Sequence, residues 1–118
     1  MGLMVNNMIT NENIQKAYQR LYDNIEILRM SVELEIDAKE LLKNTEAALM
    51  SSGSIIGKNA ETRDAQVREG TKLERLQLHE AEKAKRMAQA NYEIAAMRVR
   101  EYRDLLKLEV ILQFREDQ

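Results

Sequence analysis

Hydrophobic residues recur at helical spacing along two long stretches of this chain. Residues 12–50 and residues 72–114 each carry an apolar stripe, and apolar positions three and four residues apart are typical of one helical face. Between them lies a short segment with Gly53 and Gly57, and the chain has no proline. Two stretches of similar length joined by a compact connector favour an antiparallel hairpin. The sequence therefore predicts an all-α fold, a long coiled-coil-like two-helix hairpin.

The first stretch begins with residues that cap helices. Thr10 and Asn11 are both of the types found at helix N-termini. Beyond Val32 the stripe continues in a different phase, at Leu34, Ala38, Leu41 and Ala48, which predicts a stutter in the helix. Before that point its positions alternate at spacings of four and three: Ile14, Tyr18, Leu21, Ile25, Leu28 and Val32.

The connector, about residues 51–70, should contain a short helix at the tip of the hairpin. Gly53 is expected to end the first long helix in the left-handed conformation. Ile55 and Ile56 should fold back over the end of the helices, because bare isoleucines at a loop tip are unfavourable. Asn59 is the expected cap of a short helix over Ala60–Glu69, and Gly70 should break it.

The second long helix should begin at Thr71-Lys72-Leu73-Glu74, which has the spacing of a capping box. Its best stripe is rich in alanine, which permits close approach of two backbones. The stripe consists of Ala81, Ala84 or Lys85, Ala88, Tyr92, Ala95, Val99, Tyr102 and Leu106. A second stripe consists of Met87, Ile94, Leu105, Leu108 and Leu112.

Charge complementarity supports the antiparallel pairing. Acidic residues outnumber basic ones by three in residues 12–50, and the reverse holds in residues 72–107. Aligning the midpoints of the two stretches places Tyr22 opposite Tyr102 and Glu40 between Lys83 and Lys85. Exposed ion pairs add little stability, so this match favours an orientation more than it stabilises the hairpin.

A hairpin of two helices covers only one side of each, whereas these helices are apolar over more than one side. Self-association into a four-helix bundle, as a dimer of hairpins, is the simplest way to cover the rest. The alternative is a partner protein that supplies the missing surface. The residues expected to carry association are Ile14, Tyr18, Leu21, Ile25, Leu28, Val32, Tyr92, Val99, Tyr102 and Leu106.

Composition fits one helical domain over residues 1–118. Charged residues make up 32% and aromatic residues only 4%, as in long amphipathic helices and unlike a compact α/β core. No apolar run is long enough to span a bilayer, and MGLMVNNMIT lacks the basic start of a signal peptide. We therefore expect a cytoplasmic protein without membrane contact. Met8 is an alternative start, which would make the first seven residues an addition.

Catalytic, metal and cofactor sites are not expected. The chain has no cysteine, and His79 is its single histidine, so a structural zinc site is not available. Leu76 stands where the Glu-x-x-His motif of di-iron bundles needs glutamate. Gly57-Lys58 lacks the spacing of a phosphate-binding loop, because Ser52 replaces its first glycine and Asn59 follows the lysine. The sequence predicts that the protein is not an enzyme.

A basic face on the second long helix is the clearest electrostatic feature. Arg100, Arg103 and Lys107 share one helical face, and such a face can contact phosphates in a salt-dependent way. The net charge of −2 gives no overall attraction to nucleic acid. The competing interpretation is that these cations neutralise the acidic residues of the first helix and keep the bundle soluble.

The segment Gly57–Gln66 has the pattern G-K-N-x-x-x-R-x-x-Q between two amphipathic helices. On this pattern the chain resembles small helical-hairpin proteins encoded in phages and prophages. The resemblance implies a phage or prophage origin and brings no catalytic residues with it. Asn59, Arg63 and Gln66 either tie the connector to the helix ends or form a docking site for a partner. The function we expect is a non-catalytic interaction or assembly protein; the alternative is an accessory nucleic-acid-binding factor that uses the basic face.

Overall fold

The computed structural model describes residues 10–116, which form three α-helices and no strand. Helix α2 spans Asn11–Ser51, α3 spans Ala60–Gly70 and α4 spans Lys72–Glu116. The fold is an all-α antiparallel helical hairpin with a short helix at the tip, as the hydrophobic pattern predicts. The expectations about a signal sequence and a start at Met8 concern residues outside the described range.

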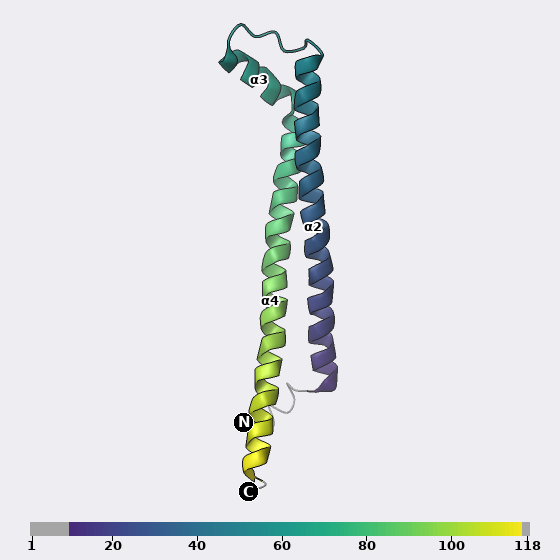
Figure 1. Cartoon of the computed structure of the whole chain (residues 1–118), viewed down its shortest axis with the longest axis vertical. Helices are drawn as coiled ribbons and strands as arrows, with labels where there is room; N and C mark the ends of the chain where they lie inside the picture. Colours follow the sequence, from purple (N-terminus) through teal and green to yellow (C-terminus); the bar gives the residue numbers. More distant parts are fainter. Residues whose placement is uncertain (1–9, 117–118) are drawn as a thin grey trace. The chain divides into compact units, whose positions relative to one another are not determined.

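The chain divides into two compact units, each containing a segment of α2 and a segment of α4. Unit 1 consists of Met1–Leu28 and Ala88–Gln118, and unit 2 consists of Arg29–Met87. Within each unit the two segments lie side by side and run in opposite directions (Figure 1). The N-terminus of α2 is capped as expected, because the Thr10 Oγ1 accepts a hydrogen bond of 3.0 Å from the backbone N–H of Asn13.

In unit 1 the seam between the helices is mostly apolar. Ala17, Ala88, Ala95 and Val99 are buried. Small residues at these points let the two backbones approach closely, which sets the distance between the helix axes. The half-buried seam positions of unit 1 are Ile14, Leu21, Asn24, Leu28, Tyr92 and Tyr102.

In unit 2 the seam contains polar and charged residues. Ser31 and Glu35 are buried on α2. On α4 Lys85 is half-buried and Ala84 is exposed, so Lys85 is the seam residue of that pair. The half-buried α2 positions that follow keep spacings of three and four residues: Ala38, Leu42, Thr45 and Leu49.

The stutter predicted in α2 is therefore wrong. Seam positions of α2 alternate at three and four residues on both sides of Ser31, with no change of phase. The predicted stripe positions Ile25 and Val32 remain 44% and 38% exposed. Seam positions instead fall at the neighbouring Asn24 and Ser31, the latter small enough to be buried against α4. The prediction relied on hydrophobicity and therefore selected the more apolar stripe. In the structure, the stripe with the smaller side chains packs against α4.

The predicted register is also shifted, by about one helical turn. Lys85 pairs with Glu35, with its Nζ 2.9 Å from the Glu35 Oε2, whereas matching the midpoints placed Lys85 near Glu40. Arg75 pairs with Glu46 in the same register. The midpoint estimate failed because α4 extends to Glu116, so the two helices are not centred on each other.

Of the three predictions made for the tip, those for Gly53 and Asn59 are confirmed. Gly53 has a φ of 75°, and Asn59 caps α3 by accepting a 2.8 Å hydrogen bond from the Thr62 N–H. The expectation that both isoleucines cover the helix ends is wrong for Ile56, which is 78% exposed; Ile55 is half-buried.

The junction of α3 and α4 differs from the predicted break and capping box. Gly70 belongs to α3, and a Cβ there would lie 2.7 Å from the Leu49 Cδ1, so a side chain at this position would require Leu49 to move. The Thr71 hydroxyl does not cap α4. It donates a 2.8 Å hydrogen bond back to the Val67 carbonyl and accepts one of 2.9 Å from the Arg75 Nε. The Thr71 side chain therefore stabilises the turn through its hydrogen bond to α3.

Candidate functional site

A buried carboxylate with two lysine partners lies in the seam of unit 2. Glu35 is 6% exposed and lies 2.9 Å from the Nζ of both Lys85 on α4 and Lys39 one turn along α2. Hydrogen bonds from Lys85 and then Lys39 hold the pKa of Glu35 below its usual value of 4.5. The same carboxylate raises the pKa of Lys39. Because both lysines satisfy it, the group is a structural ion pair and not an acid or base awaiting a substrate.

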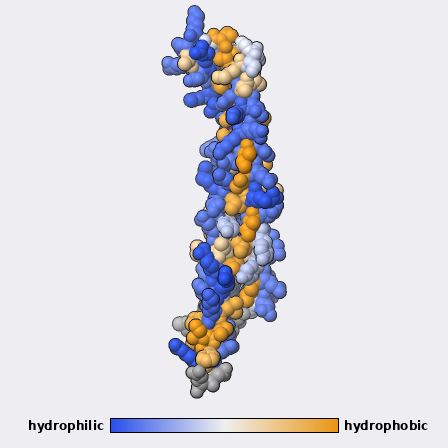
Figure 2. Space-filling model, in the orientation of Figure 1, coloured by the Kyte–Doolittle hydropathy of each residue, from blue (hydrophilic) through white to orange (hydrophobic). Residues whose placement is uncertain are grey.

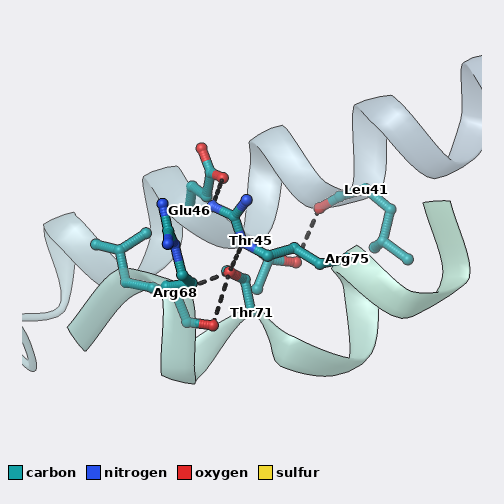
Figure 3. A network of polar contacts seen from close by, with 7 residues as sticks. Leu41, Thr45, Glu46, Arg68, Thr71 and Arg75 are labelled. Atoms are coloured by element: carbon teal, nitrogen blue, oxygen red, sulfur yellow. Dashed lines mark hydrogen bonds and ion pairs between the residues drawn. The ribbon is translucent and has the colours of Figure 1, made fainter. Parts of the chain in front are cut away.

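A second polar group joins α2 to the start of α4 (Figure 3). Thr71 has no exposed surface, and its hydroxyl oxygen accepts from Arg75, whose Nη2 donates a 3.0 Å hydrogen bond to the Glu46 Oε1. On α2 the Thr45 hydroxyl donates a hydrogen bond of 2.8 Å to the Leu41 carbonyl. No buried side-chain N or O atom in the described residues lacks a partner. The polar residues of this seam are therefore internally satisfied.

The tip motif is held together by its own side chains. The Gln66 Oε1 accepts hydrogen bonds from the N–H groups of Ile56 and Gly57, at 2.9 and 3.1 Å. A Cβ at Gly57 would lie 2.8 Å from the Arg63 backbone N, which explains this glycine. Gln66 thus ties down the connector, but by accepting from amides and not by donating to open carbonyls. Arg63 is exposed, and only its backbone N–H, bonded to the Asn59 carbonyl, takes part.

Unit 2 carries an apolar surface beside its seam, here called the leucine flank. Its residues come from both long helices and are 48–61% exposed: Met30, Leu34 and Leu41 on α2, and Leu73 and Met87 on α4. In an antiparallel pair, residues on the same side of the seam adjoin, and these five occupy one side by their heptad positions. Figure 2 shows hydrophobic side chains in a band along the long helices. The leucine flank is a surface that the hairpin itself leaves open.

The ten residues predicted to carry association fall into two groups. Tyr18, Ile25 and Val32 flank the seam on α2, and Leu106 is 36% exposed on α4. Val99 is buried in the seam of unit 1. The others are half-buried there and hold the hairpin itself together: Ile14, Leu21, Leu28, Tyr92 and Tyr102.

The predicted phosphate contacts lie in unit 1 on exposed positions of α4. Arg100, Arg103 and Lys107 are all exposed, and none makes an ion pair with a described residue. The neighbouring Arg98 behaves differently, because its Nε lies 3.7 Å from the Glu101 Oε2. Three cations on one face of α4 therefore have no anionic partner in the described part of the hairpin.

The described residues contain no group of three His, Cys, Asp or Glu side chains that could hold a metal ion. His79 is exposed on α4. Within residues 10–116, no helix is long and apolar enough to cross a membrane. Comparison with protein-family models, with curated proteins and with solved structures finds no match to this chain.

Two features of the site were missed by sequence reasoning. In the sequence Glu35 does not differ from the other acidic residues of its helix. Its position in the seam depends on the pairing with Lys85 of α4, which the sequence does not show. Leu34 and Leu41 were assigned to the stripe after the predicted stutter. Their spacing of seven residues, with Met30 one turn before Leu34, was the available signal for a separate flank.

Proposed function

We propose that this chain is a non-catalytic helical assembly protein of phage or prophage type, which works in the cytoplasm as a dimer of hairpins. The observation that carries the proposal is the leucine flank, an exposed apolar surface contributed by both long helices of unit 2. A surface of this kind on a two-helix layer is completed when a second layer covers it.

A second copy is the occupant that fits the flank best. The flank presents apolar side chains on α2 and on α4, with Asp37 and Glu80 between them at the same heptad position as Met30 and Met87. Two copies related by a two-fold axis would bring the same side chains together.

The opposite side of the same seam carries the exposed Val32 and Ile36, but it also carries an ion pair between the helices. There Glu46 and Arg75 form an ion pair with side chains 35% and 42% exposed, and burying it would remove water from two charges.

The test compares two substitutions two residues apart on α2. Leu34 and Ile36 are 58% and 56% exposed, but helical geometry turns them to opposite sides of the helix. We expect wild-type protein to have twice its chain mass of 13.7 kDa in light scattering coupled to gel filtration. Leu34→Glu should return the mass to that of one chain with helicity unchanged, and Ile36→Glu should leave the dimer intact.

Two results would overturn this assignment. A wild-type monomer at concentrations of tens of micromolar would mean that a different protein covers the leucine flank. A dimer equally sensitive to Leu34→Glu and Ile36→Glu would mean that association uses another surface.

The second candidate function is that of an accessory factor for nucleic-acid transactions. It is favoured by the three exposed cations of unit 1, Arg100, Arg103 and Lys107, which have no anionic partner among the described residues. Cations of this kind release counterions on binding a phosphate backbone, which makes affinity fall steeply with salt.

A further inference from the structure

The register of unit 1 brings a tyrosine pair and the unpaired cations to the same side of the seam. Ala17 and Tyr102 line one hollow, together with Arg20 and Arg98. Tyr18 and Arg103 are the next residues along their helices, and each step turns a side chain by about 100°. Because the helices are antiparallel, both turn to the same side, away from the hollow. Tyr18 and Arg103 therefore adjoin across the seam.

The tyrosines present aromatic surface at this place. The ring centroids of Tyr18 and Tyr22 lie 6.4 Å apart, with the planes tilted by 35°. Tyr22 is 60% exposed, and Tyr18 is half-buried. Exposed aromatic rings are the groups on which unpaired bases stack, and the interaction tolerates any base.

The charge on this side of unit 1 is positive on balance, although Glu93 lies seven residues before Arg100 and Asp104 is next to Arg103. Arg100, Arg103 and Lys107 follow one another at spacings of three and four residues, so they share a face of α4. Over seven residues this face extends roughly 10 Å along the helix. The nearby Glu101 lies against Arg98, on the other side of the seam. Acid neutralisation, the alternative role for these cations, has no partner here among the described residues.

We propose that this tyrosine strip, Tyr18 and Tyr22 with Arg100, Arg103 and Lys107, binds single-stranded nucleic acid. The tyrosines stack on bases, and the cations contact the backbone phosphates. The proposal rests on the second candidate function and narrows its ligand, because bases in a duplex are stacked on each other and not available to the rings.

The experiment measures fluorescence anisotropy of labelled oligothymidine and of a mixed-sequence duplex of equal length, at 50 and 200 mM salt. The cation variant is Arg100→Gln with Arg103→Gln and Lys107→Gln, and it should lose about tenfold or more in affinity together with much of the salt dependence. The ring variant is Tyr18→Leu with Tyr22→Leu. It should weaken single-strand binding by about tenfold while leaving duplex binding unchanged.

The matched control removes the same charge from exposed positions of α4 in unit 2, by Lys72→Gln, Lys83→Gln and Arg86→Gln. It should leave single-strand affinity within about twofold of wild type, because no ring lies beside those positions. Circular dichroism confirms that every variant keeps its helicity.

The possible failures are distinguishable. If the wild type binds neither probe at 50 mM salt, both this proposal and the second candidate function are wrong. If it binds single strand and duplex alike and the ring variant has no effect, the phosphate contacts stand and the tyrosine strip is refuted. If the control variant loses as much as the cation variant, binding follows overall charge and the site is refuted.

Discussion

The two units of the hairpin pack α2 against α4 through seams of different composition. In unit 1 the buried positions Ala17, Ala95 and Val99 are all apolar. In unit 2 the seam includes the buried Glu35 with its partner Lys85, and the fully buried Thr71. An apolar seam stabilises by removing surface from water, an effect that has no preferred direction and requires no specific partner atom. A seam with a buried charge is stable only in the helix register that places the opposite charge next to it.

The difference assigns separate roles to the units. A slip of the helices by seven residues would keep apolar residues opposite each other in much of unit 1. In unit 2 the same slip would place Glu35 opposite Leu78 instead of Lys85, leaving a carboxylate buried without its interhelical partner. Breaking a buried pair in this way is strongly unfavourable, even where the intact pair adds little net stability. We infer that the buried charge of unit 2 fixes the register more strictly than the apolar seam of unit 1 does.

The largest expected effect comes from placing a charge in the apolar seam. Val99→Asp introduces a carboxylate at a seam position that is 5% exposed. We expect a loss of roughly 3 kcal/mol or more in the free energy of unfolding, measured by urea denaturation. Arg100→Asp on the exposed face is the control and should change stability little. Equal losses for both would show that unit 1 does not depend on an apolar seam.

A smaller effect should follow from removing the hydroxyl of Thr71 in unit 2. Thr71→Val keeps the shape of the side chain but leaves the Arg75 Nε without its 2.9 Å acceptor. We expect a loss of about 1–3 kcal/mol in the free energy of unfolding, whereas Thr71→Ser, which retains the hydroxyl, should lose less. Native-state hydrogen exchange should locate the change near the α3–α4 junction. A valine variant as stable as wild type would mean that the polar seam is replaceable.

The smallest effect is a dependence on pH that should be confined to unit 2. Lys85 and Lys39 lower the pKa of Glu35 below 4.5 in the folded protein, so the unfolded chain binds the proton more readily. The contribution of Glu35 to stability is therefore complete above about pH 4.5 and is lost as the pH falls through the lowered folded value. Hydrogen exchange of unit 2 should accelerate in that range more than exchange of unit 1.

Glu35→Gln is the control for this titration, because it keeps the size of the side chain and cannot ionise. The variant should show a flatter dependence of unfolding on pH than wild type between pH 3 and 6. An identical pH profile would mean that other carboxylates govern the acid transition and that Glu35 does not distinguish the units.

The sequence predicted α4 better than α2 for a specific reason. Most of the α4 stripe has one apolar phase, and Ala88, Tyr92, Ala95, Val99 and Tyr102 occupy the seam as expected. Helix α2 offers two phases that share Ile14, Leu21 and Leu28 and differ in the positions between them. Hydrophobicity favoured the phase with Tyr18, Ile25 and Val32, whereas the structure uses the phase with Ala17, Asn24 and Ser31.

Local chemistry determined the helices and most of their ends, but not the junction at Gly70 and Thr71. The caps at Thr10 and Asn59 and the left-handed Gly53 depend on neighbours within a few residues, so the sequence specifies them directly. Only the tertiary structure decided which face of α2 meets α4. Which face of α2 packs depends on how closely small side chains let the two backbones approach. It also depends on the Glu35 carboxylate, which can be buried only next to Lys85 of the other helix. The same choice left the leucine flank and the tyrosine strip on the surface.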